Sequence, residues 1–179
     1  MKDGLFKTIL YTILGIGIMT ALMTLTSITT PIEGVYIQLA YGYLALFAGV
    51  AGAIPAAIVG FTGHVLFDLI YTDHLWLSWA LSTGALGFVF GFAIRRKSLR
   101  QGVFSQHDMI RFNVVQAVVN IAIFGLIAPT LDVLFYQQST TIVFTQGWIA
   151  SIVNLLTVAV FGTITLKLYA NYKLKQNKQ

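Results

Sequence analysis

One stretch of the chain decides its fold, residues 34–67: GVYIQLAYGYLALFAGVAGAIPAAIVGFTGHVLF. It contains no Asp, Glu, Lys or Arg. A helix needs roughly 20 apolar residues to cross about 30 Å of hydrocarbon, so this stretch is long enough for two crossings. Its centre, GVAGAIP at residues 49–55, combines two glycines with a proline. That combination predicts a turn, with Pro55 in the first turn of the following helix.

The whole chain is apolar in composition. Hydrophobic residues make up 57% of it and charged residues 9%, and the mean hydropathy is +0.80. A soluble domain carries about 25% charged residues, so the surface of this chain is suited to lipid. The chain has no cysteine, which excludes a disulfide framework, a zinc–cysteine site and a thiol nucleophile.

The basic residues gather in clusters. There are three: Lys2 and Lys7; Arg95, Arg96, Lys97, Arg100 and Arg111; and Lys167, Lys173, Lys175 and Lys178. A nucleic-acid partner would require a continuous basic face, so we interpret the clusters as juxtamembrane anchors on the cytoplasmic side. A cleaved signal peptide is not expected, because the first apolar run is too long and lacks a clear cleavage site.

The clusters also fix the number of spans. Five stretches lack Asp, Glu, Lys and Arg: 8–32, 34–67, 74–94, 112–131 and 133–166. Three of them lie between the first two clusters. If both clusters are cytoplasmic, the chain crosses the membrane an even number of times between them, so we divide the long stretch 34–67 into two spans. The stretch 133–166 is counted as one span, because polar residues 137–141 in its first half favour an external segment. The sequence therefore predicts an all-α, single-domain (1–179) integral membrane bundle with both termini cytoplasmic. Its six transmembrane helices span roughly 7–29, 35–50, 54–71, 75–95, 109–129 and 146–167.

Rows of small residues mark the helix contacts. In lipid, such residues let helices approach closely. The third span has Gly52, Ala56 and Gly60 four residues apart, and the fourth has Ala80 with Gly84 and Gly87 with Gly91. We expect these rows to pack inside the bundle. Gly17 and Ala21 on the first span fit internal packing and a partner surface equally well.

Two ionisable residues lie inside the third span. His64 and Asp68 are four residues apart, so they share a helical face, and they continue the row of Gly52, Ala56 and Gly60. Because an ionisable residue in lipid is costly, it is a functional hypothesis by default. We favour a solute-facing role, and the alternative is a self-satisfied pair that anchors the helix end.

Amides lie deeper in the last two spans. Asn113, Gln116 and Asn120 share one face of the fifth span, and Asn154 lies near the middle of the sixth. Interhelical hydrogen bonding explains Asn113 best. Asn120 and Asn154 are expected at similar depth, where they could close the floor of a cavity.

The outer half of the bundle combines aromatic and polar residues. Tyrosines and Trp76, Trp79 and Trp148 near the outer helix ends fit an aromatic belt, but Gln38 is not explained that way. Stacking surfaces, hydrogen-bonding groups and carboxylates together suit a flat polar heterocycle better than an inorganic ion or a lipid. The candidate substrate-binding residues are Glu33, Tyr36, Gln38, Tyr41, His64, Asp68, Trp76, Trp79, Asn120 and Asn154.

Several chemistries have no motif here. The sequence contains no P-loop, no Gly-x-Ser-x-Gly elbow and no His-Glu-x-x-His. No metal site and no catalytic residues are expected, since the three histidines are far apart and no nucleophile accompanies His64 and Asp68.

Three segments resemble a known family. They are IQLAYGYLAL at residues 37–46, GFTGHVLFD at 60–68 and WLSW at 76–79. They resemble the substrate-binding (S) components of energy-coupling factor (ECF) transporters, in the branch labelled as hydroxymethylpyrimidine, pyridoxine or riboflavin carriers. The resemblance covers the whole chain in length and layout, and it is specific in the second to fourth spans.

The resemblance implies a function. An S component binds a vitamin from outside, docks on a membrane coupling (T) protein that carries two ABC ATPases, and topples to release the vitamin. It implies hydroxymethylpyrimidine or pyridoxine first and riboflavin next as the ligand, no cofactor on this chain, and ATP only on the partner subunits. Gly17 and Ala21 match the motif that contacts the coupling protein, and residues 30–36 match a lid over the vitamin pocket. Relatives often carry Phe-Gly-Pro after the second helix, whereas here the proline is displaced to Pro55.

Two other classes stay open from the residues alone. A stand-alone proton-coupled carrier could use His64 and Asp68 as a relay. A membrane-embedded enzyme is disfavoured by the missing nucleophile.

Overall fold

A computed structural model of the chain describes residues 2–72 and 74–179, and these are almost entirely helical. The helices are α1 (Lys2–Leu25), α2 (Ala40–Ala51), α3 (Ala53–Phe67), α4 (Leu77–Ala93), α5 (Arg96–Arg100), α6 (Gln106–Ala122), α7 (Ala128–Tyr136), α8 (Thr140–Thr157) and α9 (Thr163–Gln176). There are also three π-helical turns. The turn η1 (Asp68–Thr72) continues α3, η2 (Ile123–Ile127) joins α6 to α7, and η3 (Val158–Gly162) joins α8 to α9. The two short strands are β1 (Ile28–Thr29) and β2 (Tyr36–Ile37).

Four continuous helices are long and apolar enough to cross a membrane. They are Leu5–Leu25, Ala53–Thr72, Gln106–Tyr136 and Thr140–Gln176, and α2 and α4 are shorter apolar helices. Large apolar side chains such as Ile13, Phe92 and Phe135 are exposed on the outside of the bundle. The prediction of an all-helical apolar bundle is confirmed.

The small-residue rows of α3 and α4 pack against each other. A Cβ atom added to Gly60 would lie 2.6 Å from the Thr83 carbonyl oxygen, and one added to Gly87 would lie 2.5 Å from that of Ala56. Neither glycine can therefore be replaced without separating the helices. The expectation that these rows serve packing inside the bundle is confirmed.

The predicted turn within 34–67 lies at Gly52. This residue has a φ of 102° and separates α2 from α3, with Pro55 in the first turn of α3. The Arg96 guanidinium donates to the carbonyl oxygens of Val50 and Ala51 at 3.1 and 2.8 Å. Those carbonyls end α2 and have no partner within the helix, so Arg96 caps α2 from the first residue of α5.

The predicted boundaries around the first loop are wrong. The first helix was expected to reach residue 29 and the second to begin at 35. Instead Ile28 pairs with Ile37, and Thr29 with Tyr36, in a short antiparallel hairpin. Backbone groups that pair across a hairpin cannot also continue a helix, so α1 ends at Leu25 and α2 begins at Ala40.

Two later boundaries also differ. The fifth helix was expected to end near 129, but it continues to Tyr136, because the Asp132 carboxylate accepts hydrogen bonds from Ser78 and Trp79 inside the bundle. The last helix was expected from 146 and begins at Thr140. Gln137, with a left-handed φ of 52°, makes the turn between them.

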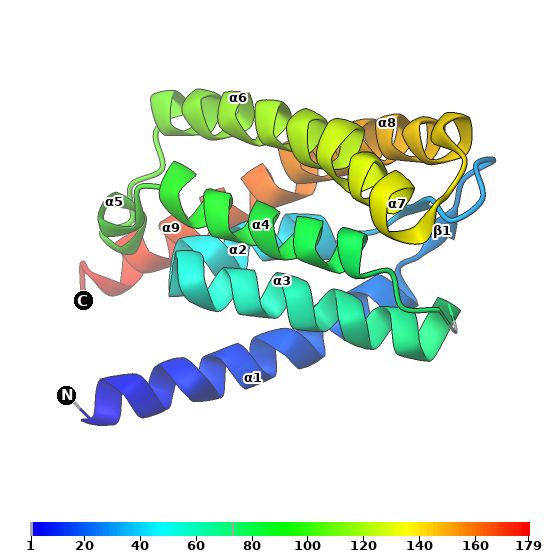
Figure 1. Cartoon of the computed structure of the whole chain (residues 1–179). Coiled ribbons are helices and arrows are strands. Elements are labelled where there is room, and N and C mark those ends of the chain that lie inside the picture. The colour runs from blue at the N-terminus through cyan, green and yellow to red at the C-terminus, as the bar shows by residue number, and fades with distance from the viewer. Residues whose placement is uncertain (1, 73) are drawn as a thin grey trace.

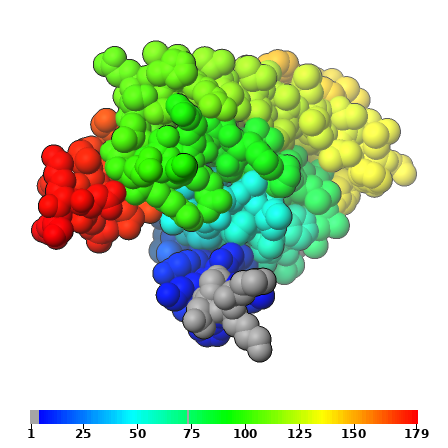
Figure 2. All heavy atoms as spheres, turned by 90° about the vertical axis from the view of Figure 1, so that its left-hand side faces the viewer, coloured from blue at the N-terminus to red at the C-terminus, as the bar shows by residue number. Residues whose placement is uncertain are grey.

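Both chain ends lie at one end of the bundle. Figure 1 shows N and C at the left, with α5 beside the C-terminal helix, and the hairpin and α7 at the right. Figure 2, seen from the end with the termini, shows α1 (blue) at one edge of the molecule. The buried core between the helices is formed by side chains such as Met19, Leu44, Phe90 and Phe112.

Candidate functional site

A cavity of about 330 Å³ opens at the hairpin end of the bundle, opposite the termini. Its walls come from the end of α1, the hairpin loop (residues 30–35), α3 with η1, α4, α7 and α8. Small-molecule pockets run from about 300 to 1,000 Å³, so the volume suits a compact ligand.

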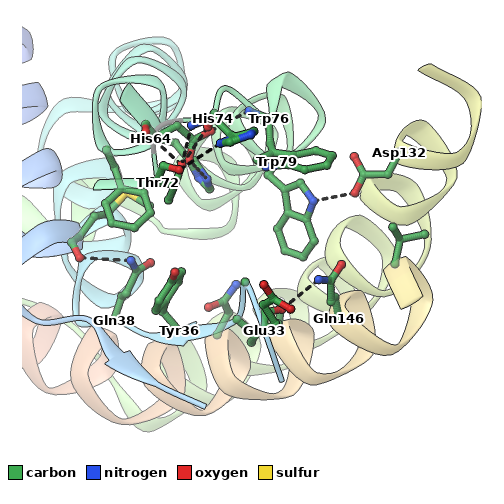
Figure 3. A pocket seen from close by; sticks show the side chains of 18 of the residues that line it. Glu33, Tyr36, Gln38, His64, Thr72, His74, Trp76, Trp79, Asp132 and Gln146 are labelled. Carbon is green, nitrogen blue, oxygen red and sulfur yellow. Dashed lines mark hydrogen bonds and ion pairs between the residues drawn. The ribbon is translucent and has the colours of Figure 1, made fainter. Parts of the chain in front are cut away.

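Nine of the ten candidate substrate-binding residues line this cavity. They are Glu33, Tyr36, Gln38, Tyr41, His64, Asp68, Trp76, Trp79 and Asn154. In Figure 3, Gln38, Tyr36 and Glu33 lie on one side of an open centre and His64 lies on the other, with the Trp79 indole at the side. Residues that are as much as 121 positions apart in sequence, from Glu33 to Asn154, therefore meet at one site.

His64 and Asp68 both pair with each other and face the cavity. His64 Nε2 lies 3.5 Å from Asp68 Oδ1, and His64 Nδ1 lies 2.7 Å from Thr83 Oγ1. The backbone N–H of Trp76 donates to Asp68 Oδ2 at 2.9 Å. The pair is therefore mutually satisfied and also lines the cavity, and its contact with a solute stays a prediction.

Gln38 presents an acceptor to the cavity. Its Nε2 donates to the Met23 carbonyl oxygen at 3.2 Å and to Ser27 Oγ at 2.8 Å. Both amide hydrogens are therefore used, while Oε1 makes no hydrogen bond within the described residues and turns toward the open centre in Figure 3. The residue is only 3% exposed, and its carbonyl oxygen is available to accept a hydrogen bond from a donor in the cavity.

Aromatic rings form the walls and are held by one another. The Trp79 ring packs on Phe124 with centroids 5.7 Å apart, and its Nε1 donates to Asp132 Oδ2 at 2.7 Å. Trp76 meets Tyr136 at 5.0 Å, and Tyr36 meets Phe67 edge-on at 6.0 Å. Rings fixed in this way can stack on a flat ligand without losing much conformational entropy.

Trp148 differs from the other two tryptophans. It was grouped with the stacking surfaces of the outer half, but it does not line the cavity, and 43% of its surface is exposed on the outside. Its position fits the aromatic belt at the membrane surface.

Asn120 is the candidate that does not line the cavity. Its Nδ2 donates to the carbonyl oxygen of Gln116 at 2.9 Å and to Gln116 Oε1 at 3.0 Å. The amide thus turns along its own helix into a buried polar row. In the same row, Asn113 Nδ2 donates to Thr163 Oγ1 at 2.9 Å, which confirms the interhelical hydrogen bond expected of Asn113.

The sequence reasoning missed part of the lining. The additional polar residues are Thr72, His74, Asp132, Gln138 and Gln146. The spacing of one row of residues could have indicated them, because residues 138, 142, 146, 150 and 154 follow one another at intervals of four and all line the cavity. Four of these five positions lie on α8, where a spacing of four places residues on one face.

The hairpin loop is tied across the cavity. Gln146 Nε2, on α8, donates to the Glu33 carbonyl oxygen at 2.9 Å (Figure 3). Within the loop, Thr30 Oγ1 donates to the Val35 carbonyl oxygen at 2.9 Å. The loop therefore lies over the cavity mouth, and among the described residues one side chain hydrogen bond attaches it to the far wall.

The small residues of α1 lie on its outer face. A Cβ atom added to Gly17 would meet nothing within 4 Å, and Ala21 is exposed. Gly15 differs, since a Cβ atom there would lie 2.5 Å from the Phe47 ring. Close packing inside the bundle thus uses Gly15 and leaves Gly17 and Ala21 uncovered on α1, the helix that lies at one edge of the molecule in Figure 2.

An apolar helical bundle with a small aromatic and polar cavity at one end defines a membrane-embedded solute-binding protein. Over residues 5–171 the chain matches the family described as the ECF-type riboflavin transporter, S component. The chain belongs to this family, so it is an integral membrane protein and a substrate-binding subunit of a transporter, and it is not an enzyme.

Relatives of similar length support the same assignment. The chain is 42% identical to a UPF0397 protein of Lactococcus lactis subsp. cremoris over 175 residues, which cover 98% of this chain and 96% of that protein. It is 38% identical to a UPF0397 protein of Enterococcus faecalis over 177 residues, covering 98% and 97% of the two chains. No solved structure matches the chain.

Proposed function

We propose that this protein captures a small water-soluble vitamin or vitamin precursor from outside the cell. It then delivers the ligand together with a membrane coupling protein and two ATPases. The observation that carries the proposal is the cavity itself, which is lined by fixed aromatic rings and hydrogen-bonding groups and lies opposite the chain ends. A flat heterocycle with polar substituents is the ligand that such walls bind best.

The proposed orientation has six spans and both termini in the cytoplasm. It counts α2 and α4 as spans beside the four longer helices. The basic connection around α5 lies at the same end as the termini (Figure 1), which agrees with the positive-inside rule. The cavity then opens to the outside of a bacterial cytoplasmic membrane.

The proposed ligand is a single-ring heterocycle such as hydroxymethylpyrimidine or pyridoxine. The cavity volume of about 330 Å³ is near the lower limit for ligand pockets. Gln38, Asp68 and Trp79 are the residues that we expect to contact the ring and its substituents. Riboflavin, which appears in the family description, is the next candidate.

Energy and partners come from other chains in this proposal. ATP is used only by the partner ATPases, and this chain needs no cofactor. Gly17 and Ala21, uncovered on α1, form the contact with the coupling protein, because small residues let another helix approach closely.

Ligand binding is tested by a thermal-shift screen of the purified chain against vitamins and their precursors. A ligand at 1,000 times its dissociation constant stabilises the folded state by about 4 kcal/mol, so the right compound gives a large rise in the thermal midpoint. Samples that are folded and show no rise with any vitamin would refute the proposal.

Delivery is tested in liposomes. Uptake should require the coupling protein, both ATPases and ATP. Uptake by this chain alone, driven by a pH gradient, would instead favour a proton-coupled carrier that uses His64 and Asp68.

A further inference from the structure

Carboxylates outnumber basic groups around the cavity, where the basic groups are the imidazoles of His64 and His74. Three carboxylates line it, those of Glu33, Asp68 and Asp132, and among the described lining residues none is Lys or Arg. Basic side chains serve the opposite end of the bundle, where Arg96 caps α2 and Lys167 Nζ donates to the Phe104 carbonyl oxygen. A ligand therefore meets negative charge without a compensating cation of the lysine or arginine type.

Two of the carboxylates are buried and held by neutral donors. Asp132 is 1% exposed and accepts from the Ser78 hydroxyl and the Trp79 indole N–H. Asp68 is 3% exposed, accepts from the backbone N–H of Trp76, and faces the imidazole of His64. These neutral donors orient the carboxylates and bring no full positive charge to them.

The third carboxylate lies at the mouth. Glu33 is exposed on the hairpin loop, and its side chain makes no hydrogen bond or ion pair within the described residues. Its backbone is fixed by the hydrogen bond from Gln146. A ligand entering beneath the loop thus passes an acid that no cation neutralises.

One uncharged group, the Gln38 amide, has the same preference. Gln38 offers only its carbonyl oxygen, because both of its amide hydrogens are used on Met23 and Ser27. The Gln38 carbonyl oxygen and the carboxylates can thus accept hydrogen bonds from ligand donors such as an amino group, a hydroxymethyl group or a protonated ring nitrogen. An anion would have to lose its hydration shell among fixed negative charges, which is costly at short range in a partly dry site.

We infer that the cavity selects for charge, accepting a neutral or cationic donor-rich heterocycle and rejecting its phosphorylated or carboxylated forms. Glu33 at the mouth and Asp68 in the depth are the residues that reject anions. For the identity of the ligand this inference rests on the proposed function, whereas the charge selection can be measured without any vitamin.

The first experiment compares matched ligands on the purified chain. Hydroxymethylpyrimidine, pyridoxine and riboflavin are each titrated beside their phosphate esters. Whichever free compound binds should have a dissociation constant at least about a hundredfold lower than that of its phosphate ester, as expected when several charges of like sign meet in a desolvated site. Glu33→Gln should reduce this ratio of dissociation constants. An ester that binds as tightly as the free form would overturn the inference.

The second experiment needs no ligand, because Trp76 and Trp79 report from inside the cavity. A Trp148→Phe background removes the third tryptophan of the chain, which is exposed elsewhere. Fluorescence is quenched with iodide, caesium and neutral acrylamide at pH 8 in a non-ionic detergent, each relative to N-acetyltryptophanamide. Iodide should quench at least about fivefold less effectively than caesium on this scale, because like charges exclude it.

Variants assign the effect to the cavity. Glu33→Gln and Asp68→Asn should each raise quenching by iodide and leave acrylamide unchanged. Asp108→Asn is the matched control, since that carboxylate accepts from Ser105 at the start of α6, away from the cavity, and an amide oxygen can still accept there. Equal quenching by iodide and caesium would refute charge selection even if a vitamin binds. Failure of every heterocycle to bind, with iodide excluded, would refute the vitamin proposal and leave charge selection standing.

Discussion

The hydrogen bond from Gln146 to the hairpin loop makes a quantitative prediction. Gln146→Ala removes the one side chain hydrogen bond described between α8 and the Glu33 backbone, a bond of 2.9 Å in partly exposed surroundings. A neutral hydrogen bond stabilises by about 0.5–1.5 kcal/mol net, and partial exposure places this one in the lower half of that range. Because about 1.4 kcal/mol corresponds to a factor of ten, opening of the loop should become roughly two- to fivefold more frequent.

Hydrogen exchange measures this opening directly. In the Gln146→Ala variant, amides of residues 30–35 should exchange about two- to fivefold faster, while those of α3 and α4 keep their rates. Release of a bound ligand, followed by tryptophan fluorescence, should accelerate by the same factor. Thr145→Ala is the matched control, because Thr145 Oγ1 donates to Thr141 of its own helix. Unchanged exchange in the loop would show that the hairpin holds itself closed and that Gln146 contributes nothing.

Three further predictions concern the core, the cavity and the capped turn. Gly15→Leu should lower the thermal midpoint because its side chain would meet Phe47, whereas Gly17→Leu, which meets open space, should leave midpoint and ligand affinity unchanged and abolish co-purification with the coupling protein. Asp68→Asn should weaken ligand affinity more than about tenfold, or about 1.4 kcal/mol, with normal expression, and an unchanged dissociation constant would remove Asp68 from the binding site. Arg96→Ala should destabilise the fold by about 1.5–3 kcal/mol, since the Ala51 carbonyl oxygen at the end of α2 loses its charged donor while Arg100 still donates to Val50; an equal loss in the exposed control Lys97→Ala would contradict this.

The sequence was most informative where one physical rule constrained many residues. The even number of spans between basic clusters located a turn that hydropathy alone does not show, and the structure has that turn at Gly52. The row from Ala56 through Gly60 to His64 and Asp68 is buried as its spacing predicted. The hairpin escaped prediction because its strands are two residues long and too short to produce an alternating pattern.

The cavity could be predicted only in part, since its walls depend on contacts between distant helices. His64 and Gln38 stood out because they are polar residues in apolar spans. Asp132 entered the sequence analysis only as the charge between the stretches 112–131 and 133–166, because its partners Ser78 and Trp79 are more than fifty residues away. The amide of Asn120 turns toward Gln116 on the same helix rather than into the cavity, and a rotamer choice of this kind leaves no trace in the spacing of residues.

The three π-helical turns have a consequence for how this family can vary. A turn closed by i→i+5 hydrogen bonds holds one residue more than an α-helical turn, and one residue rotates a helix by about 100°. Each π turn therefore accommodates one extra residue, which would otherwise rotate the following helical segment and change which of its side chains face the bundle interior. Single-residue gaps between relatives should accordingly collect within 68–72, 123–127 and 158–162, where the chain can gain or lose a position while Asp68 and Asn154, at or just before such turns, keep their places in the cavity.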